Sequence, residues 1–98
     1  MVKHMIIWKF KEGLENKEEA AKEIKTALED LCGKIDGLTK MEIVTEKLGS
    51  SSGDIMMDSE FVDNGALMAY QVHPLHQAVA NNIVRPKVEL RLSFDYEV

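Results

Sequence analysis

The segment from residue 70 to residue 76 carries the side chains best suited to acid–base chemistry. It reads Tyr-Gln-Val-His-Pro-Leu-His and holds two of the three histidines of the chain. A histidine titrates near neutral pH, so His73 or His76 can take up or release a proton without extreme tuning. The hydroxyl of Tyr70 can donate a hydrogen bond to an oxygen that gains negative charge. This segment is therefore the first candidate for a functional site.

The third histidine, His4, shares one face of a predicted strand with Ile6 and Trp8. A polar ring among apolar neighbours either has a structural partner or lines a pocket. For a single histidine the structural role is the more common one. Convergence of the three histidines and Tyr70 in space would favour a site, but spacing along the chain does not establish that convergence.

Other chemistries have weaker support, and we expect neither a metal nor a cofactor. His73 and His76 are separated by a helix-disturbing proline and have no obvious third ligand. We expect Cys32 to lie within the first helix as a small buried hydrophobe rather than as a nucleophile. The loop from Gly49 to Gly53 lacks the lysine and the following helix of a phosphate-binding loop.

The elements that must position these residues follow the order β-α-β-β-α-β. Alternating patterns predict strands at residues 2–10, 38–48, 55–61 and 87–98. Asn16 can cap a first helix, because Glu19 follows at the spacing of a capping box. Asp63 can cap a second helix, and Pro74 can begin a further helical stretch. The order predicts an α+β fold, an antiparallel sheet with its helices on one face.

Both faces of the first predicted strand carry apolar side chains. Ile6 and Trp8 lie on one face, whereas Met5 and Ile7 lie on the other. A strand exposed to water on one side would not need apolar residues there. We therefore expect something to cover each face of this strand.

Length and charge exclude several classes of protein. The chain has 98 residues, which predicts one domain over residues 1–98 and no cleft between two domains. Its 12 basic and 17 acidic residues give a net charge of −5, which argues against a nucleic-acid partner. No apolar run approaches the ~20 residues of a membrane helix, and no signal peptide is evident. With a single cysteine as well, we expect a cytoplasmic protein that associates with no membrane.

Taken together, these residues resemble the stress-responsive A/B barrel family. The Tyr70–His76 segment is the most specific part of the resemblance, which runs from Val2 to Val98. The other matching segments are Val2-Lys3-His4, Gly33-Lys34-Ile35-Asp36-Gly37-Leu38, Ser59-Glu60-Phe61 and Phe94-Asp95-Tyr96-Glu97-Val98.

The resemblance implies a ferredoxin-like protomer that pairs with a second copy into a dimeric α/β barrel. In such dimers the sheet face opposite the helices packs against its mate, which fits Met5 and Ile7. The face with His4, Ile6 and Trp8 then looks toward the helices of its own protomer, where a pocket is expected.

A plant polyketide cyclase of this family implies roles for individual residues. Its proposed base matches His76, its assisting tyrosine matches Tyr70, and a pocket histidine matches His4. The present chain departs from it by placing aliphatic or larger side chains in the pocket, which predicts a smaller and drier one. These departures are Trp8, Ile24, Leu28 and Ile55.

Two functions remain open from the sequence. The first is a homodimer that binds a small apolar molecule between the sheet and the helices. As an alternative, His76 and Tyr70 of such a dimer perform cofactor-independent acid–base chemistry of cyclase, lyase or isomerase type. The second is a stable stress-associated dimer without turnover. In that case His73 and His76 fix the proline turn and Tyr70 packs beneath them.

Overall fold

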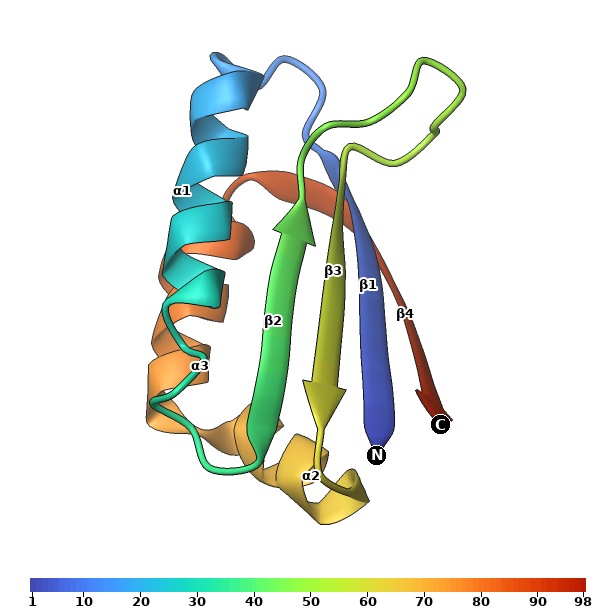
Figure 1. The fold of residues 1–98 in the computed structure, drawn as a ribbon. Coiled ribbons are helices and arrows are strands. Elements are labelled where there is room, and N and C mark those ends of the chain that lie inside the picture. The colour runs from blue at the N-terminus through green and yellow to red at the C-terminus, as the bar shows by residue number, and fades with distance from the viewer.

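Four antiparallel strands form one sheet in the order β2-β3-β1-β4, and the helices lie along one face of it (Figure 1). The computed structural model describes residues 1–98. The elements are β1 (Val2–Phe10), α1 (Lys17–Glu29), β2 (Leu38–Val44), β3 (Ile55–Phe61), α2 (Asn64–Val72), α3 (Pro74–Val79), the π-helical turn η1 (Ala80–Val84) and β4 (Val88–Glu97). This is the ferredoxin-like α+β fold, as predicted.

The register of the sheet decides which side chains face the helices. β1 is central, and its His4 lies opposite Ser59 of β3 and Asp95 of β4. Directly opposite residues point to the same face, so Ser59 and Asp95 share the helix-covered side with His4. By the same rule Trp8 lies beside Arg91 on that face.

Helix α1 begins at the predicted cap and covers the sheet with its small and aliphatic side chains. The Asn16 side chain accepts a hydrogen bond from the backbone N–H of Glu19 at 3.2 Å. At the other end, the Glu29 carboxylate accepts hydrogen bonds from the Lys25 ammonium at 2.8 Å and the Ile43 N–H at 2.9 Å. These contacts tie the end of α1 to β2. The buried residues of the helix are Ala20, Ala21, Ile24 and Leu28.

The expectation that Cys32 is a buried helical residue is wrong. Helix α1 ends at Glu29, and Cys32 lies in the turn that follows, where it is exposed. The apolar spacing of the helix continues through Leu31 and Ile35, which suggests a longer helix. Both residues are buried, but they lie in the turns that follow α1. Buried residues in the irregular turns therefore continue the three- and four-residue spacing that is typical of a helix.

The chain changes direction sharply between α2 and α3. Asp63 caps α2 by accepting a hydrogen bond from the Ala66 N–H at 2.8 Å. His73 is extended, ends α2, and caps α3 because its Nδ1 accepts from the Leu75 N–H at 3.1 Å. Pro74 occupies the first turn of α3, where its missing N–H costs nothing. The turn thus places Tyr70 and His76 on successive short helices.

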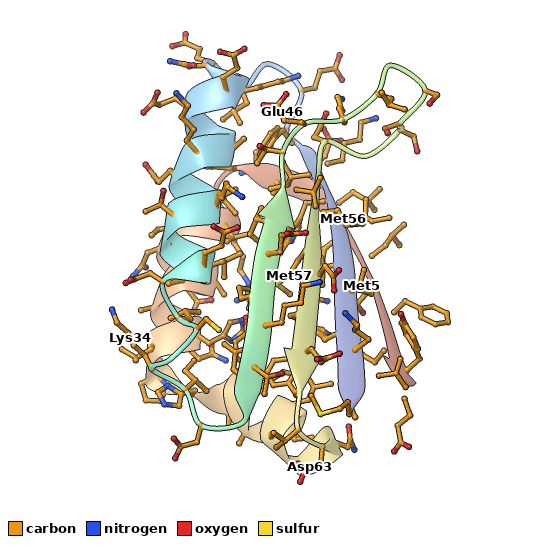
Figure 2. All side chains as sticks on the ribbon, in the orientation of Figure 1. Met5, Lys34, Glu46, Met56, Met57 and Asp63 are labelled. Atoms are coloured by element: carbon orange, nitrogen blue, oxygen red, sulfur yellow. The ribbon has the colours of Figure 1, made fainter.

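The hydrophobic core lies between the sheet and the helices, and the opposite sheet face is open. His4 and Ser59 are the buried polar residues within it. Adjacent residues of β3 show the division, since Met57 is fully buried and Met56 belongs to the open face together with Met5 (Figure 2). The large apolar side chains on the open face include Ile7, Leu90, Leu92 and Phe94.

Candidate functional site

A cavity of about 530 Å³ lies between the sheet and the helices, within the usual range for small-molecule sites. Its apolar wall comes from β1, α1, β3 and η1. Its polar wall comes from α2, α3, the turn after η1 and β4. The apolar side chains include Ile6, Trp8, Leu28, Met57 and Val84, and the polar ones include Tyr70, His76, Gln77, Arg85, Glu89 and Arg91.

Tyr70 of α2 lines the cavity and is fully buried. Its ring packs against Phe61 at 5.0 Å and against the His76 imidazole at 4.2 Å between centroids. Its hydroxyl has no hydrogen-bond partner within the chain. Burial raises the pKa of Tyr70 well above its usual value, and the positive charge of Arg91 only partly opposes this. At neutral pH the side chain is therefore a phenol whose hydroxyl is free to donate a hydrogen bond.

His76 of α3 lies beside Tyr70 as a neutral base. Burial lowers the pKa of His76, the hydrogen bond to the Gln71 carbonyl partly opposes this, and the positive charges of Arg91 and Arg85 add to the lowering. Its Nδ1 lies 3.3 Å from the backbone oxygen of Gln71. A carbonyl oxygen only accepts, so Nδ1 carries the proton of the neutral ring and Nε2 carries the lone pair. The neutral imidazole can thus accept a proton at Nε2.

His4 lies behind Tyr70 rather than in the cavity wall. Its ring is buried, its Nδ1 hydrogen-bonds the carboxylate of Asp95, and it meets the Tyr70 ring edge-on at 6.4 Å. The Ser59 hydroxyl donates to the backbone oxygen of His4 at 2.6 Å. These contacts hold the His4 ring in place against the Tyr70 ring.

No metal-ligand arrangement accompanies these residues. The chain holds no group of three or more His, Cys, Asp or Glu side chains placed to bind one ion. None of its helices combines the length and the apolar character needed to cross a membrane.

The model of the Stress responsive A/B Barrel Domain family matches residues 2–98. The chain belongs to this family. A search of curated proteins finds no match to this A/B barrel protein. Solved structures do match it, and they share its fold over nearly the whole length of the chain.

Two bacterial structures are similar in both fold and sequence. A dimeric protein of unknown function with a ferredoxin-like fold from Bacteroides fragilis is 29% identical, with a TM-score of 0.89 over 99% of this chain and 95% of that one. A Dabb family protein with a ferredoxin-like fold from Mesorhizobium loti is 25% identical, with a TM-score of 0.79 over 99% and 95%. Neither description assigns an activity.

One neighbour with a named activity shares the fold alone. The hydroxynitrile lyase from Passiflora edulis has a TM-score of 0.81 over 99% of this chain and 92% of that one, at 15% identity. An A/B barrel fold of this kind carries different sites in different proteins, so the likeness does not transfer the activity.

The structure brings together five of the residues singled out in the sequence of this A/B barrel protein. The residues in the cavity wall are Ile6, Trp8, Leu28, Tyr70 and His76. Ile24 and Ile55 lie in the hydrophobic core outside that wall, His4 lies behind it, and His73 serves as the cap between α2 and α3.

Sequence reasoning missed the polar residues that β4 contributes to the cavity wall. Glu89 and Arg91 alternate with Leu90 and Leu92 along β4, and the apolar members face away from the helices. The alternation itself was visible in the sequence. Its orientation was hidden, because apolar residues of a strand normally face the core of their own protomer.

Proposed function

We propose that the protein is a homodimer that binds a small, largely apolar molecule in the cavity between the sheet and the helices. The observation that carries the proposal is the buried Tyr70 hydroxyl, which has no partner within the chain and belongs to a residue of the cavity wall. Most buried polar groups are paired, and an unpaired one costs about 1–3 kcal/mol. A site that supplies a hydrogen bond to a bound molecule accounts for keeping such a group.

The exposed sheet face supports the homodimer. Ile7 is 44% exposed, Leu92 is 58% exposed and Phe94 is 70% exposed, although they lie together on the same face. Contiguous apolar surface of this kind marks an interaction site. The Bacteroides fragilis neighbour is described as dimeric, which agrees with a second copy as the partner.

We also propose a reducing, cytoplasmic setting without nucleic-acid or membrane partners. The chain has one cysteine, Cys32, so no internal disulfide supports the fold. Its net charge of −5 opposes attraction to polyanions.

Removing the Tyr70 hydroxyl tests the binding proposal. We expect Tyr70→Phe to bind apolar fragments with a ketone or ester oxygen more weakly, about tenfold, because a hydrogen-bond donor is lost. The free protein should be as stable as the wild type or more so, since the lost hydroxyl has no partner in the chain.

Fragment titration by NMR and thermal unfolding measure the two effects together. Tyr96→Phe is the matched control, because Tyr96 lies on β4 and not in the cavity wall. A Tyr70→Phe protein that loses stability and keeps its fragment affinity would contradict the proposal and favour a purely structural role.

A second candidate function is cofactor-independent acid–base catalysis of the cyclase, lyase or isomerase type. The observation that favours it is the neutral His76 beside the Tyr70 phenol, with ring centroids 4.2 Å apart. Such a pair could abstract a proton next to a carbonyl while the phenol stabilises the oxygen. Binding without turnover remains the favoured function, because the one lyase among the neighbours described here is only 15% identical.

Deuterium uptake distinguishes binding from this chemistry. A bound ketone fragment incubated with the protein in D₂O should gain no deuterium beyond the protein-free control if the protein only binds it. Uptake that His76→Gln abolishes would establish the acid–base function instead.

A further inference from the structure

Both arginines of the chain lie in the wall of the cavity. The sequence contains ten lysines and only two arginines, Arg85 and Arg91. Arg85 follows η1 and Arg91 lies on β4, six residues apart in the chain, yet both line the same cavity. An arginine presents a planar fork of donors that matches a carboxylate, which a lysine does not.

Neither arginine is neutralised by a carboxylate of the chain. The guanidinium group of Arg91 forms no hydrogen bond or ion pair within the protein, and that of Arg85 donates only to the neutral amide oxygen of Asn81, at 2.6 Å. Six of the ten lysines do have acidic partners. The ion pairs of lysine are Lys3–Asp58, Lys3–Glu60, Lys25–Glu29, Lys34–Asp30, Lys40–Asp58, Lys47–Asp54 and Lys87–Glu23.

The cavity wall therefore carries an excess of positive charge in an acidic protein. Its one carboxylate is that of Glu89, which accepts a hydrogen bond from the Glu12 N–H at 2.9 Å and pairs with neither arginine. The neutral His76 adds no charge. Two guanidinium groups against one carboxylate leave a positive cavity, although the chain as a whole has a net charge of −5.

The positive groups stand next to the apolar wall and to the candidate catalytic pair. Arg91 is opposite Trp8 in the register of β1 and β4, on the helix side of the sheet, where Arg91 itself is exposed. Its charge partly opposes the raised pKa of Tyr70 and adds to the lowered pKa of His76. A molecule in the cavity thus meets an apolar surface, a phenol and a guanidinium group together.

We propose that the cavity binds a small organic carboxylate, with its apolar body against Ile6, Trp8 and Met57 and its charged end held by Arg85 and Arg91. This inference rests on the proposed function, because it names the class of molecule for the same cavity. A singly charged carboxylate matches the excess charge of the wall. The Tyr70 hydroxyl remains available for a second oxygen of the same molecule.

Matched acids and amides test the proposal. The probes are phenylacetate, phenylpropionate and hexanoate, each compared with its own primary amide, which keeps the shape and removes the charge. Titration of the full-length protein by calorimetry and NMR should show each acid binding about tenfold more tightly than its amide. The preference should shrink at high ionic strength, because salt screens charges at the cavity mouth.

Variants assign the preference to the two arginines. Arg91→Gln and Arg85→Gln should each reduce the preference for the acid, and the double variant should abolish it. Lys22→Gln makes the same change of net charge on the exposed surface of α1, away from the cavity, and should leave the preference intact.

Each other outcome overturns a defined part of the proposal. Equal binding of acids and amides, weakened by Tyr70→Phe, would refute the carboxylate assignment and keep the proposed binding function. Acid preference that survives the double arginine variant would refute the role of the arginines. Stronger binding of inorganic phosphate than of any acid would replace the carboxylate with a phosphate group. Failure of every probe to bind would refute both proposals.

Discussion

At the scale of single residues, the same burial has opposite effects on Tyr70 and His76. Burial penalises the charged form of each, so it raises the pKa of the phenol and lowers the pKa of the imidazole. Both side chains are therefore neutral at pH 7. A neutral donor and a neutral base side by side suit the binding of a carbonyl compound, and they remain compatible with proton transfer.

The lowered pKa of His76 predicts a specific pH dependence of stability. An unfolded histidine has a pKa near 6.5, above that of folded His76, so the unfolded chain takes up the proton first as the pH falls. This contribution to the free energy of unfolding should therefore decline from about pH 7 down to the folded pKa. His76→Gln should remove that part of the decline.

Urea unfolding between about pH 7.5 and 5.5, with an NMR titration of the imidazole, measures the effect. Comparison of the wild type with His76→Gln cancels the carboxylates that titrate over the same range. A midpoint for His76 at or above 6.5 would contradict the burial described here.

At the scale of the elements, one glycine fixes how closely helix α2 approaches the sheet. Gly37 has a φ of +84°, and a Cβ built there would lie 2.5 Å from the Cβ of Ala66 on α2. Gly33 has a similar φ of +93°, but nothing surrounds it within 4 Å. A side chain at Gly33 would meet backbone strain alone, whereas one at Gly37 would meet both backbone strain and a close contact with α2. Helix α2 carries Tyr70, so this contact bears on the cavity.

This pair predicts unequal effects of alanine. Gly33→Ala should lower the free energy of unfolding by about 1 kcal/mol, from the left-handed backbone alone. Gly37→Ala should lower it by about 3 kcal/mol, because α2 must also move away. Chemical denaturation measures both values, and equal losses would show that α2 does not depend on this approach. The displaced helix should also weaken fragment binding in Gly37→Ala.

The elements were largely predictable because their signals are local. Strand alternation, the Asn16 and Asp63 caps and the break at Pro74 each depend on a few neighbouring residues. The end of α1 was not predictable, because the buried turn that follows continues its apolar spacing. The cavity wall of β4 was also missed, since its orientation depends on what covers the other face of the sheet.

At the scale of the whole molecule, the core of one protomer occupies only one side of the sheet. Domains of this size bury a smaller share of their surface on folding than larger domains do, so their stability is marginal. The apolar residues of the open face offer the missing burial, provided that a second copy covers them. The dimer would then be part of the stability of the fold, and not only a way to assemble two sites.

A charge placed on the open face tests this dimer directly. In Ile7→Glu the new carboxylate is solvated in a monomer, because Ile7 is 44% exposed, but it is buried when two sheets pack together. Two-fold symmetry places one such charge on each protomer, so the dissociation constant should rise on the order of 100-fold or more. Sedimentation at micromolar concentration should show a wild-type dimer and an Ile7→Glu monomer.

Met68→Glu is the control, since Met68 is 62% exposed on α2, and it should remain dimeric. A monomeric wild type, or dissociation by Met68→Glu alone, would move the interface away from the sheet.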